Sequence, residues 1–131
     1  MFITHDDILE DCQPMGLNEF FSHHEEPHTV PAKDVILIRA TIEPGEGHAF
    51  HYHEEREEFL YILEGEIEQW IGEEKRTLRT GDVVFVPPGT VHASYNIGES
   101  EAKLLAIFGN LRSKAELAVD VSEKAPWNTI R

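Results

Sequence analysis

The stretch PGEGHAFHYHEEREEFLYILEG (44–65) holds two short runs of strand-forming residues separated by a polar turn. Side chains alternate faces along a β-strand, so His51 and His53, two positions apart, should present two imidazoles on one surface. Glu58 follows after the four residues EERE, and a third imidazole, His92, follows the turn sequence VPPGT. These four side chains are the candidate ligands of one metal ion.

The donor set narrows the kind of metal. Three neutral imidazole nitrogens and one carboxylate suit Fe(II), Mn(II), Ni(II) or Zn(II). Because Cys12 is the only cysteine, thiolate zinc knuckles, iron–sulfur clusters and internal disulfides are excluded. Four protein ligands on an octahedral ion would leave two positions open, which distinguishes a catalytic or ligand-binding site from a closed structural one.

The surrounding body, residues 34–110, consists of short segments rich in Val, Ile, Leu, Phe and Tyr, separated by Gly and Pro. No strong helical period lies between these turn signals, so the pattern predicts an all-β antiparallel sandwich or barrel. We expect eight strands, at VILIRATI (35–42), AFHYH (49–53), EFLYIL (58–63), EIEQWI (66–71), KRTL (75–78), VVFV (83–86), VHASYN (91–96) and AKLLAIF (102–108).

The spacing of these residues resembles the two sequence motifs of the cupin family. The first motif is Gly, five residues, His-x-His, three or four residues, Glu, six residues and Gly. The second is Gly, five residues, Pro-x-Gly, two residues, His, three residues and Asn. The chain matches all ten specified positions, at Gly45, His51, His53, Glu58, Gly65, Gly81, Pro87, Gly89, His92 and Asn96. Chance agreement at so many positions is negligible.

The resemblance implies a double-stranded β-helix, the jelly-roll cupin barrel, with one divalent metal held inside it by the four ligands. Pro87 and Gly89 should bend the chain so that His92 enters the barrel, and Asn96 is interpreted as tying down that turn. Glu57 is the alternative carboxylate, because the motif tolerates a shorter gap. It would put seven residues before Gly65 instead of six, so Glu58 is favoured.

Two segments lie outside the motifs, an N-terminal extension (1–33) and a C-terminal extension (111–131). We expect the first to contain a helical turn opened by Thr4 and to supply an edge strand or a dimer contact, because exposed sheet edges are commonly covered. In the second, Ser113 and Glu116 have the spacing of a helix-capping box, which predicts a short helix. Edge covering and the family resemblance together favour a homodimer.

Composition excludes several classes of partner. The 131 residues suit one domain, and 25 acidic against 11 basic residues give a formal net charge of −14. Such a charge argues against nucleic acid or an anionic membrane as partner, because phosphate groups would be repelled. The first residues lack the apolar run of a signal peptide, and no apolar run is long enough to span a membrane, so we expect a cytoplasmic protein.

Other polar residues have plainer interpretations. The run SHHEEPH could bind metal opportunistically, but the histidines outside the ligand set are interpreted as structural; these are His5, His23, His24, His28 and His48. Arg39 is interpreted as an outward-facing charge, with an inward clamp for a substrate carboxylate as the alternative. The EERE run is interpreted as a solvated turn.

Aromatic residues are interpreted as core or pocket-wall residues, because aromatics at alternating strand positions pack barrels whatever the function. The residues concerned are Phe50, Tyr52, Trp70, Phe85 and Phe108. Beyond the ligands, the candidates for proton transfer are Tyr52, Tyr61 and Tyr95.

The site chemistry favours a small anionic or chelating oxygen substrate, because a divalent ion with one carboxylate ligand leaves local positive charge. The first interpretation is a metal-dependent enzyme with Fe(II) or Mn(II) favoured, and the resemblance implies a dioxygenase, a decarboxylase or an isomerase. The second is a non-catalytic module that binds a small molecule or sugar as a sensor. A purely structural zinc ion would be redundant in a barrel with its own core. Metal affinity should decline as pH falls through about 6.5, where free imidazoles protonate.

Overall fold

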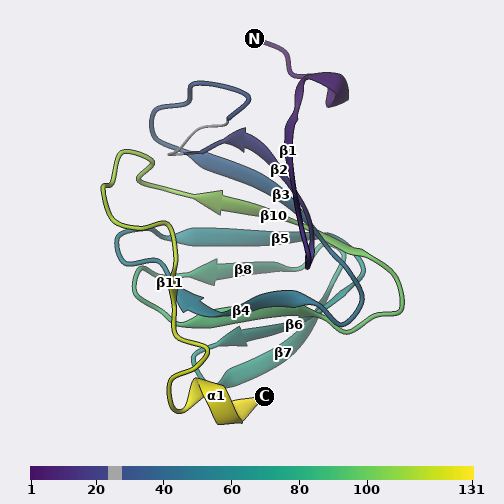
Figure 1. Cartoon of the computed structure of the whole chain (residues 1–131), viewed down its shortest axis with the longest axis vertical. Coiled ribbons are helices and arrows are strands. Elements are labelled where there is room, and N and C mark those ends of the chain that lie inside the picture. The colour runs from purple at the N-terminus through teal and green to yellow at the C-terminus, as the bar shows by residue number, and fades with distance from the viewer. Residues whose placement is uncertain (24–27) are drawn as a thin grey trace.

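Two antiparallel β-sheets lie face to face and enclose the core of the chain (Figure 1). This computed structural model describes residues 1–23 and 28–131. The six-stranded sheet has the order β1-β2-β3-β10-β5-β8, and the five-stranded sheet has the order β11-β4-β9-β6-β7. The strands are β1 (Leu9–Gln13), β2 (Gly16–Ser22), β3 (Ile36–Ile42), β4 (Gly47–Tyr52), β5 (Glu58–Glu64), β6 (Glu66–Ile71), β7 (Glu74–Arg79), β8 (Val83–Val86), β9 (His92–Asn96), β10 (Ala102–Phe108) and β11 (Val119–Asp120).

The eight strands predicted for the body are all present, as β3 to β10, and the all-β jelly-roll prediction is confirmed. Strand β10 pairs with β3 on one side and β5 on the other, although these segments are far apart in the sequence. Among the described residues, no helix is long and apolar enough to cross a membrane.

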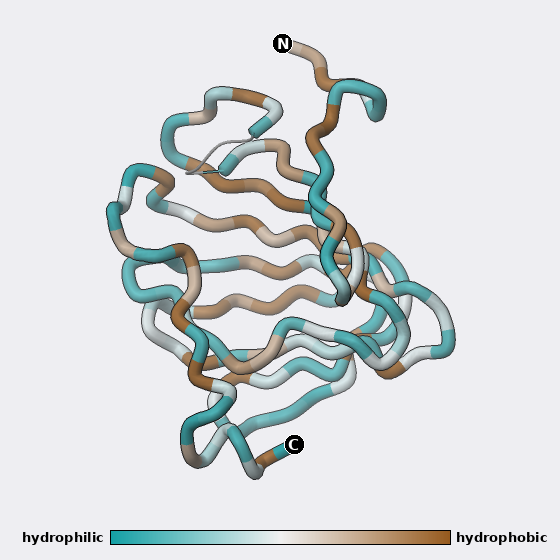
Figure 2. Tube along the Cα trace, viewed as in Figure 1, coloured by the Kyte–Doolittle hydropathy of each residue, from teal (hydrophilic) through white to brown (hydrophobic). Residues whose placement is uncertain are grey.

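The main core lies between the two sheets and follows the alternation of the strands. Every second residue of β3 and β10 is buried there, and Ile67 of β6 contributes from the opposite sheet. Figure 2 shows the apolar stretches along the strands of the six-stranded sheet. Each fully buried aliphatic side chain contributes about 1.5–3 kcal/mol, so the barrel does not depend on a metal ion for its core.

A second apolar cluster covers the outer face of the five-stranded sheet. Phe50 and Trp70 are buried there, and Phe50 stacks on Trp127 with ring centroids 5.2 Å apart. Trp127 begins α1 (Trp127–Ile130), so the end of the chain closes over this face. The two sheet aromatics are therefore core residues, as predicted, and they face away from the barrel interior.

The N-terminal extension has the elements expected of it. Thr4 precedes the 3-10 turn η1 (His5–Asp7), and its amide nitrogen and hydroxyl donate to the Asp7 carboxylate at 3.0 and 2.7 Å. Strands β1 and β2 then extend the six-stranded sheet, with β1 outermost. The segment thus supplies the predicted edge strand, whereas its role in a dimer contact stays a prediction. His24 lies outside the described residues.

The C-terminal extension does not contain the predicted helix after Ser113. Residues 113–118 are irregular backbone with bends at 115 and 117, and β11 pairs with β4 just beyond them. The Ser113 hydroxyl accepts from the amide of Ala115, two residues later, at 3.1 Å. The carbonyls that a helix would pair with amides four residues on instead accept hydrogen bonds from Arg56. A tertiary contact has replaced the local helix.

Candidate metal site

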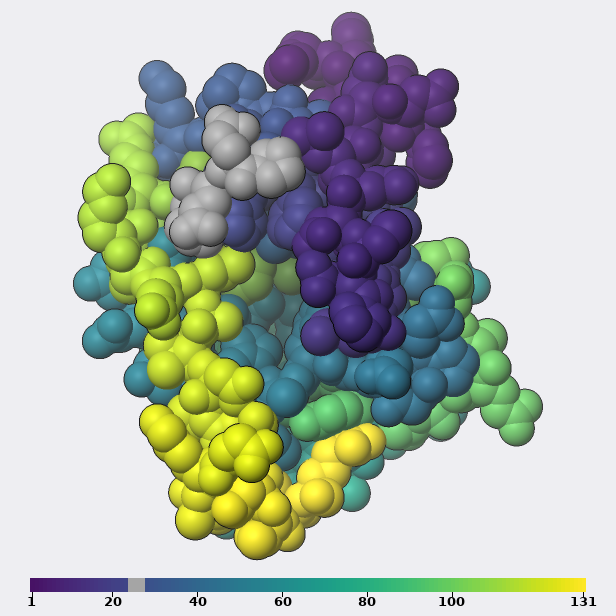
Figure 3. Space-filling model, in the orientation of Figure 1, coloured from purple at the N-terminus to yellow at the C-terminus, as the bar shows by residue number. Residues whose placement is uncertain are grey.

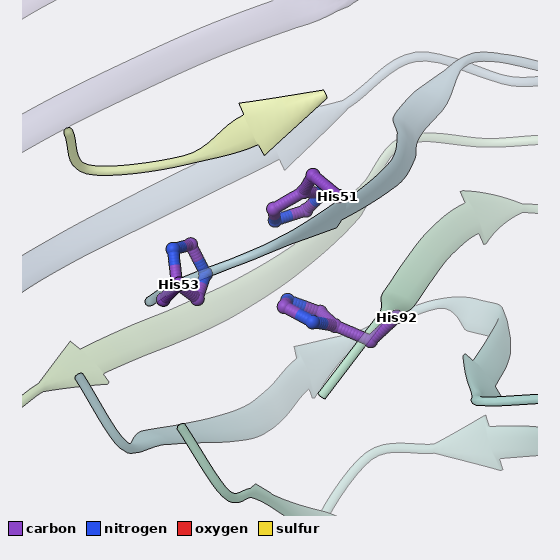
Figure 4. A group of neighbouring side chains, drawn as sticks. All are labelled: His51, His53 and His92. Carbon is purple, nitrogen blue, oxygen red and sulfur yellow. The ribbon is translucent and has the colours of Figure 1, made fainter. Parts of the chain in front are cut away.

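The candidate ligands come from two adjacent strands of the five-stranded sheet, β4 and β9, and from the start of β5 in the facing sheet. His51 is on β4, and His53 lies just beyond the end of this strand. Glu58 begins β5 and His92 begins β9, where His92 pairs across the ladder with His51. The three histidines each offer a ring nitrogen within 4.8 Å of the others, and Figure 4 shows the rings turned toward one another. The structure brings the four predicted residues together.

The turn before His92 is fastened to the other motif. Gly89 has a φ of +73°, which side chains rarely adopt, and its amide donates to the carbonyl of His53 at 2.7 Å. Asn96 does not tie down this turn, contrary to the prediction. Its side-chain amide donates to the carbonyls of Ile42 and Ser100, both at 2.8 Å, so it fixes the loop after β9 instead.

The far side of each imidazole is held by a backbone carbonyl. Nδ1 of His51 lies 2.6 Å from the carbonyl oxygen of Ala49, and Nδ1 of His92 lies 3.0 Å from that of Thr90. His53 makes the equivalent contact with the carbonyl of Leu117. A carbonyl can only accept, so each Nδ1 carries a proton, and in the neutral form of each ring the lone pair is on Nε2. Metal-binding histidines are oriented in this way.

Glu58 lies against two of these lone pairs. Its Oε2 is 3.2 Å from Nε2 of His53 and 2.9 Å from Nε2 of His92, and the Glu58 and His92 residues are 3% and 1% exposed. These three buried atoms have no hydrogen-bond partner among the described residues. Acceptor lone pairs facing a carboxylate repel each other unless a cation or a proton lies between them. The donor set and its orphaned atoms therefore fit a divalent cation.

The electrostatics keep two of the candidate ligands, His51 and Glu58, in the protonation states that a metal requires. Burial lowers the pKa of His51 to about 3, and the neighbouring His92 adds to the effect. Burial raises the pKa of Glu58, but hydrogen bonds with His53 and His92, which place a proton where a cation would otherwise lie, outweigh burial and lower this pKa to about 2. At neutral pH the site thus contains a neutral His51 and an ionised Glu58.

Glu58 and Glu57 differ clearly in the structure. Glu58 is buried in the site, whereas Glu57 is exposed in the connecting turn. The neighbouring Glu54 and Glu55 are also exposed, as expected of a solvated turn. Arg56 contradicts that expectation because it is fully buried.

A cavity of about 450 Å³ opens beside the three histidines. Its apolar wall comes from the six-stranded sheet and includes Ile38, Leu60 and Phe108. Both terminal extensions contribute to the lining, and Figure 3 shows a hollow between them. The polar residues of the lining, apart from the candidate ligands, are Asn18, His23, His48, Ser94 and Asp120.

A family model for the cupin domain matches residues 38–108, more than half of the chain, including all four candidate ligands. The chain belongs to the cupin family. Polyketide synthase CurC of Streptomyces cyaneus is 33% identical over 100 residues, which are 76% of this cupin and 64% of the relative. Quercetin 2,3-dioxygenase of Bacillus subtilis is 32% identical over 72 residues, 55% of this cupin and 21% of the enzyme. The cupin thus spans less than two thirds of either relative.

The fold also matches solved structures. KdgF from Halomonas sp. superposes with a TM-score of 0.71 and 22% sequence identity, over 84% of this cupin and 94% of that chain. At this identity the likeness shows the fold alone, a small double-stranded β-helix.

Sequence reasoning missed His48 as a cavity residue. His48 pairs with Ser94 and His51 pairs with His92, and the register shifts by one residue between the two pairs. Such a β-bulge re-aims a side chain. His48 and His51 are three positions apart, so regular alternation would put their side chains on opposite faces of β4. The bulge puts them on the same face. Burial also lowers the pKa of His48, which favours a neutral ring. No residue of the stretch signals this bulge in advance.

The other polar candidates lie elsewhere. Of the described residues that line the cavity, none is a tyrosine, and Tyr61 is exposed on the outer face of its sheet. Tyr52 and Tyr95 pack in the second apolar cluster. Arg39 donates from Nε and Nη2 to the two carboxylate oxygens of Glu19, and neither residue lines this cavity. The outward-facing interpretation is confirmed.

Proposed function

We propose that this cupin is a metal-dependent enzyme that binds one divalent transition metal per chain through His51, His53, Glu58 and His92. The observation that carries the proposal is that Nε2 of His53, Nε2 of His92 and Oε2 of Glu58 are buried together without hydrogen-bond partners among the described residues. Three rings have their Nδ1 atoms committed to carbonyls, and two of their buried Nε2 atoms face an ionised carboxylate. Imidazole and carboxylate donors without thiolate favour Fe(II) or Mn(II), and Zn(II) and Ni(II) also fit.

The substrate class follows from the cavity. Its apolar wall suits an aromatic or aliphatic body, and the ligand set suits a pair of chelating oxygens such as those of a hydroxy-ketone, a diketone or a hydroxy acid. A bound divalent ion would supply Lewis acidity to those oxygens. His48 and Ser94 would hydrogen-bond polar groups of the substrate, and Phe108 and Leu60 would exclude water from its body. A dioxygenase-type oxidation, a decarboxylation and an isomerisation are all compatible with this class.

The relatives support an enzyme that acts on oxygen-rich substrates. One is named for polyketide synthesis and another for oxidation of a flavonol. This resemblance covers part of each relative, so we take from it the class of substrate alone.

Metal content and oxygen consumption test this proposal together. We expect protein purified anaerobically without chelators to contain about one Fe or Mn per chain by elemental analysis. With flavonols, diketones or hydroxy acids we further expect the protein to consume oxygen. A decarboxylase or isomerase would instead consume these substrates without oxygen. A protein that binds no metal even after anaerobic reconstitution would contradict the metal assignment. A protein that binds metal and these compounds without any turnover would instead support the sensor module.

We also propose that the cupin is a homodimer formed through an outer-face patch on β5 and β8, defined as Phe59, Tyr61, Val83 and Phe85. These side chains are 45%, 41%, 53% and 46% exposed, so Phe85 is not the core residue that was predicted. The Phe59 and Phe85 rings lie 5.0 Å apart across the strand pair. Half-exposed side chains of this size leave roughly 350 Å² in water, nearly half of the roughly 800 Å² that each partner contributes to a standard interface.

A second copy is the occupant we favour because a flat, uncharged sheet face is complementary to itself about a twofold axis. We expect analytical ultracentrifugation to give twice the chain mass of 15.0 kDa for the wild type. Phe85→Glu should give the monomer, because it would place two carboxylates in an apolar interface. Ile97→Glu is the matched control, since Ile97 is 44% exposed in the loop after β9. A monomeric wild type at about 100 μM, well above ordinary dimer dissociation constants, would contradict the proposal.

A further inference from the structure

We propose that Arg56 is a positioning residue for the candidate metal site, acting through residues 113–117 of the C-terminal extension on the ring of His53. This inference rests on the proposed metal-binding function. Arg56 belongs to the EERE turn, which was predicted to be solvated, and its contacts make the C-terminal extension part of the site.

The guanidinium of Arg56 is fully buried and bound to backbone carbonyls. Nη1 donates to Ala115 and Glu116 at 3.1 and 3.0 Å, and Nη2 donates to Ser113 at 3.1 Å. Burying a cation is unfavourable. Here Nη1 and Nη2 are bound to carbonyls, whereas Nε has no hydrogen-bond partner among the described residues, so the segment is held by the two terminal nitrogens of a planar group with several donors. Arg56 thereby fixes the path of a segment that forms neither helix nor sheet.

The next carbonyl along that segment, of Leu117, is the acceptor for Nδ1 of His53. The other two rings differ in this respect. His51 and His92 use carbonyls two residues earlier on their own strands, at Ala49 and Thr90. Within the triad, His53 alone depends on a segment 64 positions away for the contact that sets its tautomer.

Further contacts join the turn and the extension into one unit. The side-chain amide of Asn110 donates to the carbonyl of Glu55 at 3.0 Å, and the hydroxyl of Ser113 donates to the Glu55 carboxylate. The amide of Gly109 donates to the carbonyl of Glu57 at 3.2 Å. The turn connects His53 to Glu58, so the extension is fastened to the piece of chain that carries two of the four candidate ligands.

Loss of this anchor has a specific chemical consequence. If the Leu117 carbonyl moves away, Nδ1 of His53 loses its acceptor. The ring can then carry its proton on Nε2, which already lies 3.2 Å from the Glu58 carboxylate and would donate to it. In that tautomer the lone pair is on Nδ1, so Nε2, the atom that faces the site, cannot bind a metal, and its proton also occupies the Glu58 carboxylate.

The test compares Arg56→Met and Arg56→Lys with the control Arg76→Met. Arg76 is exposed and pairs with Glu74 on β7. In metal-free protein, long-range ¹H–¹⁵N spectra of the imidazoles report each tautomer, and competition titrations measure Zn(II) affinity. We expect Arg56→Met to shift His53 toward the Nε2–H tautomer, leave His51 and His92 unchanged, and weaken Zn(II) binding by about 10- to 100-fold. Arg56→Lys should be intermediate, and Arg76→Met should match the wild type.

A folded Arg56→Met variant with the wild-type His53 tautomer and Zn(II) affinity would overturn the inference. If this variant does not fold, Ser113→Ala loosens the same segment without leaving carbonyls around an apolar side chain, and it should shift the His53 tautomer in the same direction. An unchanged tautomer in that variant would also overturn the inference. If the wild type binds no metal, the proposed function fails, whereas the tautomer spectra still decide the role of Arg56.

Discussion

Replacing His53 or His92 with alanine should reduce the bound metal from about one ion per chain to near zero. Each ring supplies one of four candidate donors, and both Nε2 atoms lie within 3.2 Å of the Glu58 carboxylate. Even outer-shell partners of metal ligands are worth about 10- to 100-fold in affinity, so loss of a ligand should cost more than about 100-fold. Elemental analysis after desalting checks this, and His51→Ala should behave in the same way.

The barrel itself should survive these substitutions. The main core contains none of the candidate ligands, because it is built from aliphatic residues such as Ile62 and Leu104 between the sheets. Circular dichroism should therefore show a folded β-protein for each variant. Glu64→Ala is the control, since Glu64 is exposed and pairs with Lys103 away from the triad. Stoichiometric metal in all three triad variants would show that the ion binds elsewhere.

The strands, and the grouping of the four candidate ligands, could be predicted because both follow from short-range patterns. Alternation places His51 and His53 on one face, and the Gly and Pro positions set where each strand ends. The spacing of the second motif then identifies His92, whose strand pairs with that of His51. Alternation and motif spacing depend only on residues close together in the sequence, so predicting them required no knowledge of the three-dimensional packing.

The failures share a different cause, which is contact between distant segments. The acidic sequence around Arg56 predicts a surface residue. In the structure residues 113–116 cover it and accept its hydrogen bonds. The same contact cancels the helix that the Ser113 capping signal predicts. His48 faces the cavity through a bulge in one ladder, and Phe85 lies on the outer side of β8, opposite the exposed Phe59 of β5. Strand periodicity predicts which side chains share a face of the sheet, but not which distant segment packs on that face.

The metal-free protein should lose stability in acid, and His51 should determine the first part of that loss. In the unfolded chain His51 takes up a proton near its ordinary pKa of 6.5, whereas in the folded chain its pKa is about 3. The unfolded state therefore binds more protons between these two values, and the free energy of unfolding falls as pH decreases from 6.5. The ring is partly accessible, so we expect a slope of about 1 kcal/mol per pH unit, below the full value for one proton.

Glu58 acts with the same sign in a lower range. Its ordinary pKa of 4.5 falls to about 2 in the folded chain, so its stabilising contribution is complete above 4.5 and disappears between 4.5 and 2. Urea unfolding of chelated protein at pH 8, 6, 5 and 4 measures the dependence. His51→Gln should flatten it between about pH 6.5 and 5, and His5→Gln should not. Equal slopes for the wild type and His51→Gln would contradict the assignment. The same shift means that His51 itself does not account for weaker metal binding through pH 6.5, because its folded ring stays neutral well below that value.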